Sequence, residues 1–171
     1  MNFLHRTNGK PSPRKRYSST PQVSKSAQRL VKAQNEKLRT IMNELLNTPP
    51  TTYSKTGHWA WYVWPTQMEG MSDTKRTAVK NIDDADFVVH QKSVHTWSRI
   101  LYLLAEALKG RHTSDVIPNI DHGRIRHFLK EWPKYSPVLP SEFMVALLRF
   151  KDAWKKAELQ DVKQRLHNQR F

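Results

Sequence analysis

The 171-residue chain contains no cysteine and only five glycines. Without cysteine it can build neither a disulfide framework nor a thiolate metal site. Its glycines form no phosphate-binding loop of the GxGxxG or GxxxxGK(S/T) type, and no GxSxG motif presents a serine nucleophile. These absences exclude the common nucleotide-binding loops, serine hydrolases built on that motif and cysteine-ligated metal proteins.

Long apolar runs are missing as well. No stretch of about 20 apolar residues occurs, so we expect no membrane-spanning helix. The first residues do not resemble a signal peptide, because Met1-Asn2-Phe3-Leu4 is followed directly by His5 and Arg6. We therefore do not expect secretion through a signal peptide.

Acidic residues are scarce, at 15 against 29 Lys and Arg, and the net charge of +14 is unevenly distributed. Residues 1–40 contain ten basic residues but one acid, Glu36, whereas residues 41–150 contain thirteen basic and eleven acidic residues. Residues 1–22 also hold Pro11, Pro13 and Pro21, and nothing there can form a core. The sequence predicts an extended basic arm over residues 1–22 and a single helical domain over residues 23–171.

A cationic arm on a nearly neutral body attracts phosphate backbones, anionic lipid headgroups or an acidic protein surface. A merely solvated tail is the alternative. The candidate residues for binding a partner or polyanion are Arg6, Lys10, Arg14, Lys15, Arg16, Lys25 and Arg29.

Apolar residues recur at helical spacing through most of the body, which predicts an all-α fold. Helices are expected over residues 24–47, 83–90, 93–109, 121–132 and from 141 onward, with a short turn between 114 and 117. Ser24 or Ser26, Asp121 and Ser141 are expected to cap helices, and Gly110 to adopt a left-handed conformation. The expected inner face of the last helix consists of Phe143, Met144, Leu147, Leu148, Trp154 and Val162.

Residues 57–72, GHWAWYVWPTQMEGMS, hold three of the six tryptophans. Pro65, Gly70 and Ser72 prevent a long regular element, so we expect an irregular buried segment with one helical turn. Tryptophans can also stack on single-stranded nucleic acid, but a helix separates these rings from the basic arm, which favours a place in the core. The expected aromatic core consists of His58, Trp59, Trp61, Trp64, Trp97 and Trp132, with His58 buried and bonded to the backbone.

The run His58-Trp59-x-Trp61-x-x-Trp64-Pro65, followed by Gly70-x-Ser72, resembles the opening signature of the domain-of-unknown-function 1810 family. Looser similarities extend the resemblance over about residues 55–132, so the arm and the last helix are expected to lie outside it. One departure is Thr66, where the family usually has Gln after the proline. The resemblance implies a small, mostly helical fold, supplies no catalytic residue, and implies relatives in large DNA viruses.

Eight histidines raise the question of a metal site. The closest helical pairs, His90 with His95 and His122 with His127, are five residues apart, so neither pair places two ligands on one helix face. We therefore expect no metal and no cofactor. His58 and Asp121 are candidates for acid–base chemistry, but no further group converges on them in the sequence, and Asp121 is more simply a helix cap.

The sequence therefore favours a non-enzymatic structural subunit of a large assembly. Its most concrete form is a minor capsid, or cementing, protein of a large DNA virus, whose arm reaches neighbouring protein subunits. We expect such a protein in the virion or inside the cell, in the cytoplasm or nucleus. A nucleic-acid-binding protein without sequence specificity is the alternative, since the arm could bind phosphates, and an uncharacterised enzyme with a site near His58 is the third possibility.

Overall fold

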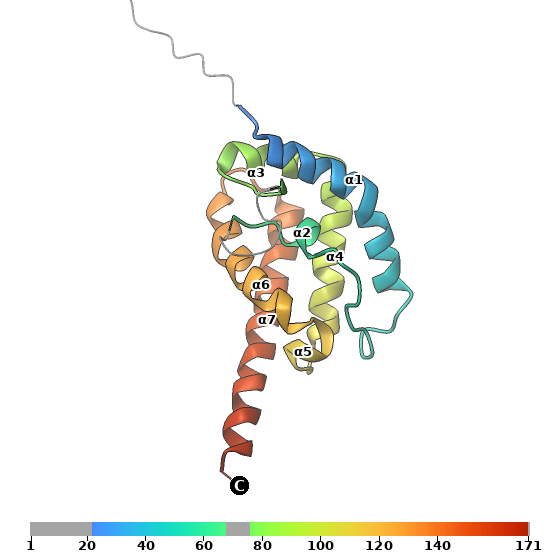
Figure 1. Cartoon of the computed structure of the whole chain (residues 1–171), viewed down its shortest axis with the longest axis vertical. Coiled ribbons are helices and arrows are strands. Elements are labelled where there is room, and N and C mark those ends of the chain that lie inside the picture. Colours follow the sequence, from blue (N-terminus) through green and yellow to red (C-terminus); the bar gives the residue numbers. More distant parts are fainter. Residues whose placement is uncertain (1–21, 68–75, 171) are drawn as a thin grey trace, which may run out of the picture.

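The computed structural model describes residues 22–67 and 76–170 (Figure 1). Over these two ranges the chain forms helices and no strand, which confirms the all-α fold. The elements are α1 (Lys25–Leu46), α2 (Ala60–Val63), α3 (Ile82–Val89), α4 (Ser93–Leu108), α5 (Thr113–Val116), α6 (Asn119–Glu131), the 3-10 helix η2 (Trp132–Tyr135) and α7 (Ser141–Asn168). The predicted arm lies, apart from residue 22, outside the described residues.

Helix α4 lies at the centre of the domain and packs most extensively against α7 and then against α1. Its apolar residues Ile100, Leu101 and Leu104 are completely buried. Gly110 follows α4 with a φ of 66°, as predicted, because a residue without a Cβ adopts this conformation most easily. Within the described part of the chain, no helix is both long enough and apolar enough to cross a membrane.

The start of α1 is fixed by a buried carboxylate. The Ser24 hydroxyl accepts a hydrogen bond from the Ala27 N–H and so caps the helix, as predicted. Asp84, which is completely buried, accepts hydrogen bonds from the Ser24 N–H at 2.8 Å, the Ser24 hydroxyl at 2.7 Å and the Lys80 N–H at 2.9 Å. Asn81 caps α3 in turn by accepting from the Asp84 N–H. The beginnings of α1 and α3 are therefore locked together.

The tryptophan-rich segment is irregular apart from the single turn of α2, as predicted, and it runs between the helices. Such a segment needs partners for its backbone carbonyls, because buried polar groups are costly when unpaired. The indole N–H groups of Trp97 and Trp132 donate to Val63 O and Pro65 O, both at 2.9 Å, and the Gln34 amide donates to Tyr62 O at 3.0 Å. Side chains of three other elements thus hold this stretch of backbone in the core.

Two expected helix caps are wrong. Helix α6 begins two residues before Asp121, with Pro118 at its cap position, because proline fixes a φ that suits the start of a helix. Asp121 lies in the first turn of α6 instead. Similarly, Pro140 takes the cap position of α7, and Ser141 is its first helical residue.

The predicted inner face of α7 is also partly wrong. Leu148 and Val162 are 48% and 43% exposed, and Met144 is only half-buried. The residues of α7 that enter the core are Phe143, Ala146, Leu147, Phe150, Trp154 and Ala157. The sequence is ambiguous here because α7 carries a second apolar stripe on its opposite face. Its C-terminal half, red in Figure 1, extends beyond the rest of the domain.

Candidate functional site

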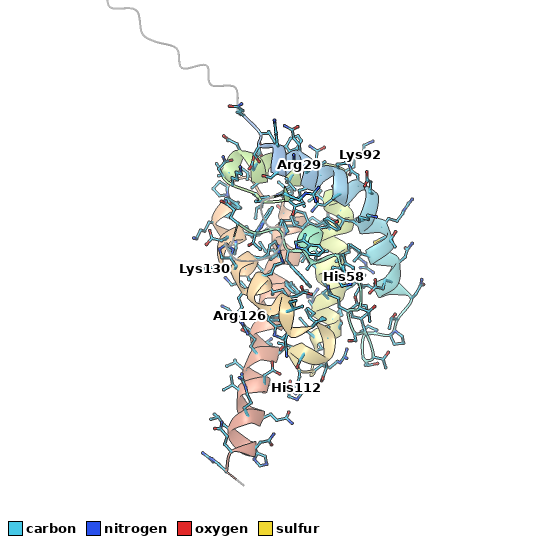
Figure 2. The ribbon with its side chains drawn as sticks, in the orientation of Figure 1. Arg29, His58, Lys92, His112, Arg126 and Lys130 are labelled. Atoms are coloured by element: carbon cyan, nitrogen blue, oxygen red, sulfur yellow. The ribbon has the colours of Figure 1, made fainter. Side chains whose placement is uncertain are left out.

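An open groove of about 1030 Å³ lies between α7 and the segment that carries α5 and the start of α6. Most residues that line it are polar or charged, and they include His112, Thr113, Arg126, Glu158 and Asp161. Figure 2 labels His112, which directly precedes α5, and Arg126 of α6. This groove brings together several titratable side chains, so it is the first place to look for chemistry.

The polar groups of the groove are engaged with one another. Asp161 lies with Oδ1 2.7 Å from Nδ1 of His112 and accepts a hydrogen bond of 2.6 Å from the Thr113 hydroxyl. Arg126 donates to Glu158 at 2.6 Å. All of these contacts join α7 to the α5–α6 region. They act as tethers that hold the last helix at the point where it leaves the domain.

His112, Asp161 and Thr113 are the residue types of a nucleophilic triad, but their connections differ from one. In a triad the hydroxyl donates to the histidine, and the carboxylate orients that histidine from the other side. Here the Thr113 hydroxyl donates to the carboxylate itself. Both His112 and Thr113 therefore converge on Asp161, which suits a helix anchor better than a nucleophile.

His58 is exposed, so the prediction that it is buried and bonded to the backbone is wrong (Figure 2). The histidine with that environment is His122, which is 8% exposed, places Nε2 2.8 Å from Ile117 O and meets the Trp154 ring edge-to-face. His58 is displaced to the surface because its neighbour Trp59 takes the inward position, with only 5% of its surface exposed.

Asp121 pairs with a residue that sequence reasoning missed. Lys55 is 6% exposed, and its ammonium lies 2.7 Å from Asp121 Oδ2, donates to Gly57 O at 2.6 Å and sits 4.8 Å from the centre of the Trp59 ring. A buried ammonium needs such a set of partners, since an uncompensated charge in the interior is costly. Nothing in the local sequence distinguishes Lys55, because its partner lies far along the chain.

The expected aromatic core is largely as the sequence suggests. Trp59, Trp64, Trp97 and Trp132 are each at most 5% exposed, whereas Trp61 is half-buried. Trp97 meets Trp132 edge-to-face with ring centres 5.0 Å apart, and Trp64 stacks on Phe150 at 6.0 Å. Trp154, which is 1% exposed, also belongs to this core. The sequence signal for its burial is its position in the apolar stripe of the last helix.

Three side chains with displaced pKa values lie outside the groove. Burial, together with the charge and hydrogen bond of Glu44, raises the pKa of Tyr53 far above its ordinary value of 10.0. Burial likewise raises the pKa of Tyr135, and the hydrogen bond from Lys134 lowers the pKa of the half-buried Glu131. Among the described residues, no three His, Cys, Asp or Glu side chains lie close enough to hold a metal ion.

The outward face of α1 carries a line of cations. Lys25, Arg29, Lys32 and Arg39 are exposed and follow one another at helical spacing, with Glu36 as the acidic residue on the same face. Figure 2 shows Arg29 on this helix. We call these four residues the basic face of α1. Two of them, Lys25 and Arg29, are sequence-predicted contact residues; the other five, Arg6, Lys10, Arg14, Lys15 and Arg16, lie outside the described residues.

Comparison with known proteins identifies the family but no function. No curated protein and no solved structure matches the chain. The family match covers more of the chain than the expected residues 55–132. It begins at Ser24, the cap of α1, and ends at Asp161, the residue that anchors α7. It therefore includes α1 and most of the last helix, both of which lie outside residues 55–132. Residues 24–161 match the family described as Protein of unknown function (DUF1810), and the chain belongs to that family.

Proposed function

We propose that this protein is a non-enzymatic subunit of a larger assembly, which contacts its neighbours through its basic N-terminal side. The observation that carries the proposal is the basic face of α1. Three acidic residues of the body are engaged within the domain: Asp84 accepts hydrogen bonds at the start of α1, Asp121 pairs with Lys55, and Asp161 anchors α7. No such ion pair joins the basic face to another described residue, so its charges are available to a partner.

The start of α1, where the predicted arm joins the described body, is held in place by hydrogen bonds. Ser24, where the described helical body begins, is held through Asp84. The cations predicted for the arm therefore continue directly into cations on a rigid helix. Such a surface fits an acidic protein neighbour, and in its most concrete form the assembly is the capsid of a large DNA virus, with this chain as a minor, cementing protein.

The environments of the candidate catalytic residues also favour a non-enzymatic role. His58 is exposed, Asp121 is neutralised by Lys55, and the polar groups of the groove serve as tethers between helices. A general acid–base site needs a group that is within reach of a substrate proton and is not engaged elsewhere. The groups described above do not provide such a set.

The proposal is tested by sedimentation of the assemblies that contain the protein. We compare the full chain, a chain lacking residues 1–22, and the triple variant Lys25→Glu/Arg29→Glu/Lys32→Glu. Both altered chains should keep the melting temperature within a few degrees, because Lys25, Arg29 and Lys32 are exposed and the sequence predicts no core residue within 1–22. Both should leave the heavy fractions. A triple variant that co-sediments as fully as the unaltered chain contradicts the proposal.

Binding to nucleic acid is the second candidate, because the same cations would also contact phosphates. Its signature is a steep dependence of affinity on salt, with about 0.9 log units lost per log unit of salt for each phosphate neutralised. The triple variant should then reduce that slope by about 3 units for a duplex of arbitrary sequence. A flat salt response excludes this candidate and leaves the protein neighbour.

A further inference from the structure

The face of α7 that points away from the core is apolar at regular intervals. Val145, Leu148, Leu159, Val162 and Leu166 are between 43% and 63% exposed. Together with Asp152 and Lys155, which are also exposed, they follow one another at alternating steps of three and four residues. This spacing is the heptad repeat of a coiled-coil seam. We call these seven residues the outer seam.

The outer seam lies outside the core. The core-facing residues of α7, such as Phe150 and Trp154, lie on the opposite side of the helix and are completely or almost completely buried. A single copy of the chain therefore leaves five large aliphatic side chains of one helix in water. A second helix with the same repeat would cover them by inserting side chains between them.

The two charged residues of the seam decide which helix fits. In an antiparallel pair of two α7 helices, with the two-fold axis between residues 153 and 154, Asp152 faces Lys155 of the second copy, and this pairing occurs twice. The same register places Leu148 against Leu159 and Val145 against Val162. A parallel pair would instead place Asp152 against Asp152 and Lys155 against Lys155, which is repulsive. We infer that α7 forms an antiparallel coiled coil with α7 of a second copy of this chain.

The shape of the domain suits this pairing. The C-terminal half of α7 projects beyond the body, whereas the N-terminal half lies beside α4 (Figure 1). Val145 and Leu148 belong to this N-terminal half. In the antiparallel pair each projecting half covers the body-packed half of the other copy. One flank of the seam pairs Lys151 with Glu158, and the other brings Arg149 against Lys156, a repulsion that moderate salt screens.

The test measures the self-association of the full chain at moderate salt, by sedimentation velocity over a concentration series that reaches several hundred micromolar. The wild type should pass from monomer to dimer. Asp152→Lys and Lys155→Asp should each weaken the dimer by about tenfold or more, because both charged layers become repulsive. An equimolar mixture of these two variants should form the dimer again, since every layer then pairs opposite charges.

Controls separate the seam from general effects of charge. Arg170→Asp makes the same change of charge as Lys155→Asp at an exposed position beyond the seam and should leave the dimer unchanged. All substituted residues are exposed, so the circular dichroism and melting temperature of each dilute variant should match the wild type. A wild type that stays monomeric, a dimer that both seam variants leave intact, or an Arg170→Asp effect as large as theirs overturns the inference.

Discussion

Helices α1 and α7 play the same part in the core but present different surfaces to the outside. Each packs against α4 with one apolar face, through residues such as Leu38 in α1 and Phe150 in α7. Outside, α1 carries the basic face and α7 carries the aliphatic outer seam. Because core packing requires only the inner faces, the outer faces are free to differ. Their chemistry points to an anionic neighbour for α1 and an apolar one for α7.

The largest effect should separate the inner from the outer faces. Phe150→Ala should lower the free energy of unfolding by about 3–5 kcal/mol, because it leaves a cavity next to Trp64. Leu148→Ala, at a residue 48% exposed on the outer seam, should change it by no more than about 0.5 kcal/mol. Urea unfolding of the dilute monomer, followed by circular dichroism, measures both values.

The matched pair on α1 is Leu38→Ala and Arg39→Ala. Leu38 is 1% exposed, and Leu38→Ala should lower the free energy of unfolding by about 2–5 kcal/mol. Arg39 is exposed, and Arg39→Ala should lower it by about 0.5 kcal/mol or less.

If Leu148→Ala were as destabilising as Phe150→Ala in the monomer, the outer seam would have to pack within its own chain, and the comparison of the two helices would fail.

The same contrast explains how well each helix could be predicted. The bounds of α1 follow from the Ser24 cap, a single apolar stripe and the stop at Pro49 and Pro50. An apolar stripe identifies a buried face only when the opposite face is polar. In α7 both faces are apolar, so the periodicity predicts the helix but cannot tell Phe150, which is buried, from Leu148, which is not.

Polar contacts between residues far apart in the chain could not be predicted from the sequence. Lys55 and Asp121, or Ser24 and Asp84, become neighbours only through the tertiary fold, and neither member of a pair carries a local signal for the other. The exposure of His58 could not be predicted from the sequence either. Its position beside three tryptophans suggests burial, but the orientation of the chain at Trp59 places it in solvent.

A further prediction compares the carboxylates that anchor the two helices. Asp84→Asn should cost about 2–3 kcal/mol, because the buried amide has one acceptor oxygen where Asp84 receives three hydrogen bonds. Asp161→Asn should cost only about 1 kcal/mol, since the Asp161 side chain is 17% exposed and water can replace part of its contacts. Urea unfolding measures the stability, and hydrogen exchange should report faster opening of the first turn of α1 only in Asp84→Asn.

Equal costs for the two substitutions would contradict this ranking. They would indicate that the anchor of α7 is as essential to the domain as that of α1. The exchange pattern provides an independent check, because Asp161→Asn should loosen α7 near residue 161 and leave the start of α1 protected.

The smallest expected effect is a loss of stability at alkaline pH, caused by Tyr53, which contacts α1. The Tyr53 hydroxyl donates to Glu44 of α1 at 3.0 Å, and burial with this carboxylate raises the pKa of Tyr53 above 10.0. The folded state therefore keeps the phenol proton that the unfolded chain releases above about pH 10. The stabilisation is complete below pH 10 and is lost as the pH rises towards the folded pKa. Between pH 9 and 11 the loss should be about 1.4 kcal/mol.

Tyr53→Phe isolates this contribution, because it removes the ionisable group while every lysine still titrates. The free energy of unfolding of the variant should fall less than that of the wild type between pH 9 and 11, although the variant is less stable at neutral pH through its lost hydrogen bond. Helix α7 contains no tyrosine, so its tethers offer no comparable source of alkaline sensitivity. Parallel curves for the two proteins would show that the environment of Tyr53 is not what couples the end of α1 to pH.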